Sequence, residues 1–237
     1  MIKFTKLLPA MIFLLIAVGC KSIPTQNPAA KDSSVLAVEM SVKQFLGSKT
    51  ASRVHIVRVD KKVNPGQTLI SKTPVIASNW ADRGVTYYLN VEPGEYIVVA
   101  MEYEVKQQAQ ETSSATSGNV TVTTSSGGGT TIFTVITNKE TAEKSKTKVA
   151  AGQLAYMGSF LIDTNKEYAQ ADENQKHYAN ILKPGMLTNS GLFGNFFAVD
   201  LLGTLVSYTK DDEKVKEFKE DSKKSFAETP WSYLTEK

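Results

Sequence analysis

The feature that most constrains the fold is an alternation of apolar and polar residues that recurs from Ser33 to about Asp163. Every second residue is apolar in Val85 to Val91, and Ile97 begins a similar series in Tyr96 to Val105. Because successive side chains of a strand point to opposite faces, this pattern predicts strands with one buried face. Several short strands separated by turn residues predict an antiparallel β-sandwich or barrel of seven or eight strands.

The segment Glu92-Pro93-Gly94-Glu95 lies between the two clearest strands. Proline fixes φ at the second position of a type II turn, and glycine accepts the positive φ required at the third. We therefore expect Val85 to Val91 and Tyr96 to Val105 to form a hairpin.

Two segments resemble motifs of small bacterial β-sandwich modules. Tyr88-Leu89-Asn90-Val91-Glu92-Pro93-Gly94-Glu95-Tyr96 is similar to the Pro-Gly-x-Tyr hairpin of transthyretin-like and PEGA-type modules, and Val149-Ala150-Ala151-Gly152-Gln153-Leu154-Ala155-Tyr156 resembles their later strand. The resemblance covers residues 33–163 and implies an Ig-like or transthyretin-like sandwich. It implies no enzymatic activity, because such modules serve as spacers, adhesive domains or lipoprotein ectodomains.

An insertion rich in Ser, Thr and Gly separates the two motifs, from Gln107 to Thr131. It contains a short β-type run, Val120 to Thr123, and then Gly127-Gly128-Gly129. No Gly-Lys-Ser/Thr follows these glycines, so the run is not a phosphate-binding loop. We expect a protruding hairpin with a flexible tip, a core strand over Ile132 to Ile136, and a charged hairpin or loop over Asn138 to Lys148.

Residues 164–237 change pattern and predict a helical extension that packs on the sandwich. Tyr168 to Leu182 and Asp211 to Glu228 have helical spacing, and the second carries acids at its start and an apolar stripe. Between them Gly191 to Tyr208 is strongly apolar and includes Phe193, Phe196 and Phe197. This segment either packs on the sandwich or forms a surface for a membrane, a partner or a hydrophobic ligand.

The N-terminus has the pattern of a bacterial lipoprotein signal. Lys3 and Lys6 precede a twelve-residue apolar run, Leu7 to Val18, and Gly19-Cys20 follows. That run is too short for a helix to span about 30 Å of hydrocarbon, which indicates a removed signal peptide, residues 1–19. Cys20 is the only cysteine and has no disulfide partner, so we expect fatty acyl chains, such as palmitate, on Cys20. Buried acyl chains contribute about 0.8 kcal/mol per methylene to membrane anchoring.

Residues 20–32 contain little apolar material and predict a flexible tether between the lipidated cysteine and the domain. Lys21 follows the cysteine at the position where inner-membrane lipoproteins of enteric bacteria carry Asp, which favours the outer membrane; the side on which the domain lies stays open. Loss of Lys3 and Lys6 reduces the formal charge from +3 to +1, which argues against nucleic-acid binding.

No motif for catalysis, a cofactor or a metal was found. His55 and His177 are not paired by any local spacing, and a zinc site would need further ligands. The run that begins at Asp163 lacks the glycine of a calcium loop, since Tyr168 takes that place.

Three hypotheses follow from the sequence. The first is a non-enzymatic envelope lipoprotein whose β domain serves in binding, adhesion or structural support. The second is a carrier of lipid or a small hydrophobic ligand with a cavity near residues 192–206. The third is an enzyme, which would require a cleft where His55 or His177 meets carboxylates.

Overall fold

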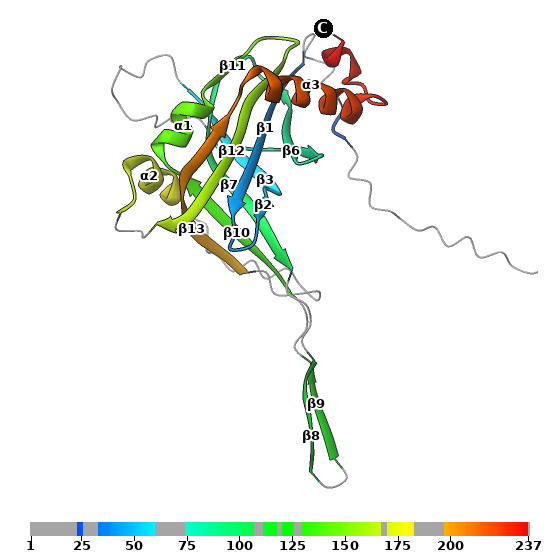
Figure 1. Ribbon diagram of the computed structural model, residues 1–237, viewed down its shortest axis with the longest axis vertical. Coiled ribbons are helices and arrows are strands. Elements are labelled where there is room, and N and C mark those ends of the chain that lie inside the picture. Colours follow the sequence, from blue (N-terminus) through cyan, green and yellow to red (C-terminus); the bar gives the residue numbers. More distant parts are fainter. Residues whose placement is uncertain are drawn as a thin grey trace, which may run out of the picture.

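The fold is built around one strongly curled mixed sheet (Figure 1). The structure, a computed structural model, describes residues 23–25, 33–59, 74–106, 111–117, 120–125, 129–166, 170–182 and 197–236. Within these residues the sheet has eleven strands, nine of them in the order β4-β3-β7-β10-β13-β12-β1-β6-β5, with β11 on β7 and β2 on β1. The strands are β1 Ser34–Lys43, β2 Ser48–Thr50, β3 Arg53–Arg58, β4 Ile76–Ala77, β5 Trp80–Asp82, β6 Val85–Val91, β7 Gly94–Lys106, β10 Thr130–Thr137, β11 Thr147–Val149, β12 Leu154–Lys166 and β13 Phe197–Thr209.

The prediction of a mainly β fold is confirmed, but the prediction of an antiparallel sheet is wrong. β1 pairs with β12 in parallel, with Val35 opposite Leu154, and β10 pairs with β13 in parallel, with Thr131 opposite Phe197. Alternation along one strand defines its buried face and carries no information on the direction of its neighbour. The result is an open half-barrel rather than a clear sandwich.

The predicted hairpin of β6 and β7 is also wrong. β6 pairs with β1 and β5, whereas β7 pairs with β3, β10 and β11, so the Glu92-Pro93 corner connects two separate parts of the curled sheet. Gly94 does not have a positive φ. A Cβ at Gly94 would instead lie 2.7 Å from Nε of Arg58, whose guanidinium donates to Glu92 and to the Pro93 carbonyl. The close approach of the Arg58 side chain to the backbone therefore accounts for glycine at position 94, and a positive φ does not.

The main hydrophobic core fills the concave side of the half-barrel. β6 contributes Tyr88 and β7 contributes Met101 to the same buried cluster. The two parts of the sheet that the Glu92-Pro93 corner connects therefore face each other across this core. Its other large buried members include Leu36, Met40, Ile56, Tyr96 and Phe160.

The prediction of a helical extension over residues 164–237 is wrong in its centre. β12 continues to Lys166, and β13 occupies the middle of the sheet between β10 and β12. Leu201 and Leu205 pack on the main core, whereas Leu202 is buried in a different cluster and Val206 is 47% exposed, so the apolar residues of β13 do not alternate with polar ones, which explains the error. Gly203 permits this central position, because a Cβ there would lie 2.6 Å from the side chains of both Val135 and Ile162.

Helices cover the outside of the half-barrel at two places. α1 Lys139–Ser145 and α2 Glu173–Leu182 pack near β7 and β10 over a second buried cluster that includes Ile97 and Tyr178. α1 and β11 therefore replace the charged loop predicted over Asn138 to Lys148; the Asn138 side chain accepts from the Thr141 N–H and begins α1. α2 lies inside the predicted helix.

The C-terminal helix α3 Asp212–Phe226 confirms its prediction. The Asp211 side chain accepts from the Lys214 N–H at 2.8 Å and caps the helix, and Phe218, Ser222 and Phe226 form its buried stripe. A 3-10 helix, η3 Ser232–Thr235, follows and packs on α3. The α3–η3 unit covers a third cluster with residues of β1, β6 and β12.

The insertion forms the predicted hairpin. β8 Glu111–Ser117 and β9 Val120–Ser125 pair only with each other within the described residues, and they extend beyond the ends of β7 and β10 (Figure 1). Lys106 and Thr130 pair with each other at those ends. They mark one end of the sheet, whereas β11 and α3 lie at the other end.

The prediction of an unpacked tether is wrong for Ile23 to Thr25. Ile23 is half-buried and packs against the α3–η3 cluster, although it is the only large apolar residue of its segment. Trp231 Nε1 donates to the Pro24 carbonyl at 2.8 Å, and Asn90 Nδ2 donates to the Thr25 carbonyl at 2.9 Å. Backbone carbonyls, which a composition-based argument does not consider, provide these two contacts.

Candidate ligand-binding site

The sequence-predicted site residues fall mostly outside the described part of the chain. This holds for Cys20, Phe193 and Phe196. Phe197 begins β13 opposite Thr131, and its side chain is outside the description. Residues 192–196 of the proposed cavity lie outside the described residues, whereas Leu201 and Leu205 pack against the main core and Leu202 is buried in the second cluster.

The two histidines differ in their surroundings. His55 Nε2 lies 2.8 Å from Oε1 of Glu102, and Arg53 lies 3.3 Å from the other carboxylate oxygen. Burial alone would raise the pKa of Glu102, but the hydrogen bond and charge of His55, together with Arg53, hold that pKa below its ordinary value. His177 stacks edge-on against Tyr178, and its Nε2 is buried without a hydrogen-bond partner among the described residues. His55 thus meets a carboxylate that no local spacing predicted.

The His55–Glu102 pair lies on the sheet between β3 and β7, and neither residue lines the pocket of about 510 Å³ or the pocket of about 340 Å³ on the described surface. Among the described residues no group of three or more His, Cys, Asp or Glu side chains could hold a metal ion. The pair with Arg53 therefore acts as a partly buried ion pair that joins β3 to β7.

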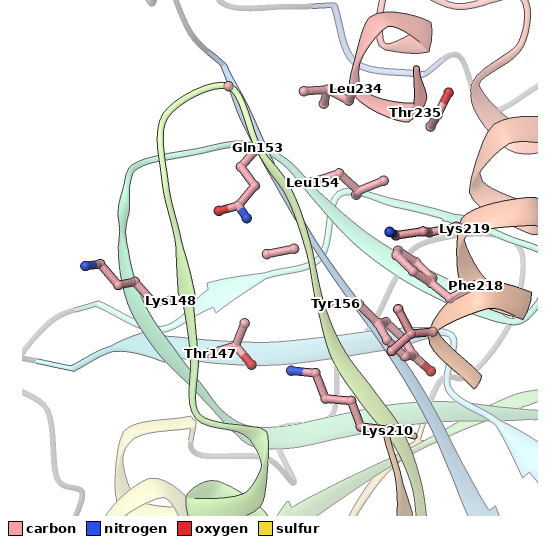
Figure 2. Close-up of a pocket in the computed structure, with 13 residues that line it drawn as sticks. Thr147, Lys148, Gln153, Leu154, Tyr156, Lys210, Phe218, Lys219, Leu234 and Thr235 are labelled. Carbon is pink, nitrogen blue, oxygen red and sulfur yellow. The ribbon is translucent and has the colours of Figure 1, made fainter. Parts of the chain in front are cut away.

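A larger candidate site is a pocket of about 510 Å³ between the sheet and the C-terminal helices (Figure 2). β11 and the start of β12 form one side, α3 and η3 form the other, and Lys210 enters from the link between β13 and α3. Its apolar lining consists of Leu154, Ala155, Val215, Phe218 and Leu234, together with the ring of Tyr156. We call it the α3 pocket.

A network of hydrogen bonds and ring contacts fixes the wall of the α3 pocket. The Tyr156 ring stacks on Phe218 with centroids 4.1 Å apart and planes 9° from parallel, and the Tyr156 hydroxyl donates to Glu39 at 2.9 Å. Lys214 bridges Glu39 and Glu217 at 2.8 and 2.9 Å. Burial raises the pKa of Tyr156, and the charge of Glu39 raises it further, so the hydroxyl stays protonated and continues to donate.

The charged lining of the α3 pocket has one sign. Lys148, Lys210 and Lys219 line it, while no Asp or Glu is present among the described lining residues. None of the three lysines forms an ion pair within the part of the chain that the structure describes. Figure 2 shows the Lys219 side chain extending from α3 toward β12 and the Lys210 ammonium pointing toward Thr147, whereas the Lys148 ammonium points away from the other lining residues.

Thr147 and Lys210 are the two polar groups of the α3 pocket whose surroundings most favour an anionic ligand. The Thr147 side-chain hydroxyl is buried and has no hydrogen-bond partner among the described residues. Lys210 is exposed at the edge of the pocket, yet partial loss of water around its ammonium group lowers its pKa. An unpaired buried hydroxyl and a partly desolvated cation are both stabilised by a ligand oxygen that carries negative charge.

A second pocket, of about 340 Å³, lies beside the Glu92-Pro93 corner and includes Tyr88, whose buried hydroxyl also lacks a described partner. Its cation, Arg58, is already bound to Glu92 and to the Pro93 carbonyl. Its charge is therefore satisfied within the protein, and the α3 pocket is the better candidate for an anion.

Sequence reasoning missed the α3 pocket, because its lysines come from β11, the β13–α3 link and α3, which only the fold brings together. The signal that was available is Gly152-Gln153-Leu154-Ala155-Tyr156, which contributes five lining residues in a row. The resemblance assigned this segment to a strand without a binding role.

Comparisons with known proteins add little. No family model and no curated protein matches the chain. One solved structure from Pseudomonas aeruginosa, a "putative carbohydrate binding protein", has 14% sequence identity over 53% of this chain and 88% of its own length. The TM-score of 0.22 is too low for this likeness to carry an argument about fold or function.

Proposed function

We propose that the protein is a non-enzymatic bacterial envelope lipoprotein, anchored through acylated Cys20, whose β domain binds a small anionic molecule in the α3 pocket. The observation that carries the binding proposal is the lining of that pocket, which combines Lys210 and Lys219, an unpartnered buried hydroxyl and no acidic side chain among the described residues with an aromatic wall.

The lining also specifies the shape of the ligand. The stacked Tyr156 and Phe218 rings, with Leu154 and Val215, favour an apolar or planar body, while Lys210 and Thr147 favour a carboxylate, phosphate or sulfonate at one end. A volume of about 510 Å³ suits a molecule of metabolite or short lipid size.

The anchoring part of the proposal rests on the residue pattern from Met1 to Cys20, with Lys21 favouring the outer membrane. No helix in the described residues is long and apolar enough to cross a bilayer. Replacement of Cys20 by Ser should move the protein from the membrane fraction to the soluble fraction. Unchanged membrane retention would contradict the lipid anchor.

A titration with an anionic fluorescent probe tests the binding proposal. 8-Anilinonaphthalene-1-sulfonate carries a sulfonate on an aromatic body and should bind the folded protein, and Lys210→Met should weaken its affinity roughly ten-fold by removing one charged contact. The matched control is Lys216→Met on an exposed position of α3 that does not line the pocket. Equal affinities for both variants would refute the assignment of the anion to the α3 pocket.

The hypothesis of a carrier for lipid or a small hydrophobic ligand differs from this proposal in the site and in the charge of the ligand. A cavity near Phe193, Phe196 and Phe197 would take an uncharged hydrophobic ligand, whereas the α3 pocket selects for negative charge. N-phenyl-1-naphthylamine, which lacks the sulfonate, distinguishes the two sites. Tighter binding of this uncharged probe than of the sulfonated one, with no effect of Lys210→Met, would favour a site near Phe193.

A further inference from the structure

The contacts of Ile23 to Thr25 limit how far the domain can stand from its lipid anchor. Ile23 lies three residues after Cys20, and a chain spans at most about 3.6 Å per residue, so the docked Ile23 is within about 11 Å of the acylated cysteine. A tether free up to Ser33 would span roughly 45 Å by the same rule.

The docking site is one end of the half-barrel. Ile23 packs against the buried cluster that α3 and η3 share with β1, β6 and β12, and the carbonyls of Pro24 and Thr25 accept from Trp231 and Asn90. Leu154 begins β12 and lies opposite Val35 at the start of β1. The anchor-proximal segment, the α3–η3 unit and the first residues of β1 and β12 are thus gathered at the same end (Figure 1).

We propose, on the basis of the proposed lipid anchor, that the α3–η3 end of the domain faces the bilayer and rests on its head groups, with the β8–β9 hairpin directed away from the membrane. β1 runs for ten residues, or about 33 Å, from the docked end to the opposite end. This length exceeds the reach left to the docked chain, so the opposite end cannot lie at the head groups while Ile23 remains docked.

A competing orientation is suggested by the turn between β1 and β2. Phe45 and Leu46 are 100% and 87% exposed there, and exposed apolar side chains at a turn are typical of contacts with a membrane or a partner. A flexible tether would allow this turn to insert into the same bilayer. The docked tether places it on the distal side, together with the β8–β9 hairpin.

Quenching by head-group nitroxide lipid tests the orientation on the full-length, lipidated protein in phosphatidylcholine vesicles. Acylation occupies the only native cysteine, so an engineered cysteine is a single labelling site. We compare a fluorophore at Glu228→Cys, exposed after α3, with one at Ser48→Cys, exposed at the opposite end of β1. The label at position 228 should lose most of its fluorescence while that at position 48 is unaffected; the reverse pattern would overturn the proposal in favour of the Phe45–Leu46 orientation.

Two insertions of the same Gly-Ser spacer test the docked segment itself. A spacer between Ser22 and Ile23 lengthens the chain before the docked residues and should reduce quenching at position 228, whereas one between Asn27 and Pro28 follows them and should leave it unchanged. Equal effects of the two spacers would refute the docking. Release of the Cys20→Ser protein into the supernatant reports on the anchor separately, so a failed anchor and a failed orientation give different results.

Discussion

Replacing Phe218 by Ala tests the packing of the α3–η3 unit, on which both the pocket and the docked segment depend. Phe218 is 3% exposed, stacks on Tyr156, and belongs to the cluster that includes Val35, Ala37 and Leu234. Removal of a buried phenylalanine side chain costs about 3–5 kcal/mol. Because one side of this ring borders the α3 pocket, fewer contacts are lost than in a closed core, and we expect a value of about 3 kcal/mol.

Urea unfolding followed by tryptophan fluorescence measures this loss. Both tryptophans of the chain, Trp80 and Trp231, belong to the same cluster, so the emission reports on this unit directly. With a slope of about 3 kcal/mol per molar urea, the midpoint should fall by about 1 M.

The matched control for Phe218→Ala is Phe45→Ala, which removes the same atoms from a fully exposed side chain and should leave the midpoint unchanged. A midpoint for Phe218→Ala equal to that of Phe45→Ala would refute the packing described here. A change in tryptophan emission without loss of the β signal in circular dichroism would show that α3–η3 unfolds separately from the sheet.

Two further predictions concern the rest of the domain. Because the pKa of Glu102 is lowered in the folded state, its interaction with His55 and Arg53 should stabilise the fold above about pH 4.5, the ordinary pKa, and this contribution should be lost as the pH falls through the lowered pKa. The melting temperature of Glu102→Gln should therefore depend less on pH below about 4.5 than that of the wild type. Parallel melting profiles of the two proteins would contradict this role of Glu102. Replacing residues 111–125 by a short Gly-Ser link should leave the urea midpoint unchanged, because β8 and β9 pair only with each other within the described residues; loss of folding would show that the hairpin supports the sheet.

Local patterns in the sequence predicted individual elements well. The alternation in Val85 to Val91 and in Tyr96 to Val105 identified β6 and β7, and the acidic start and apolar stripe of Asp211 to Glu228 identified α3. These features depend on side chains a few residues apart, which the chain itself fixes in a helix or a strand.

The arrangement of the strands could not be predicted from such patterns. Leu154 lies opposite Val35 in a parallel pair, across 119 residues of chain, and nothing in either segment specifies that partner. β13 was obscured because its apolar residues do not alternate with polar ones, and its central position depends on the close contact of Gly203 with Val135 and Ile162. Parallel pairing and the packing of apolar side chains on both faces of one strand are properties of the whole sheet.

The site was missed for a related reason. Thr147 lies more than sixty residues before Lys210 and Phe218 along the chain, and only the curl of the sheet and the docking of α3 bring them to one pocket. The contacts of Pro24 and Thr25 use backbone carbonyls, which every residue type offers, so no sequence signal marked them.

The most direct test of the central claim is native mass spectrometry of the mature protein purified from cells that produce and lipidate it. We predict a fraction carrying one bound anionic molecule with an apolar body, and this fraction should be retained in Lys216→Met and strongly reduced in Lys210→Met. A wild-type protein that is free of ligand, or that carries an uncharged ligand equally in all three proteins, would contradict binding in the α3 pocket.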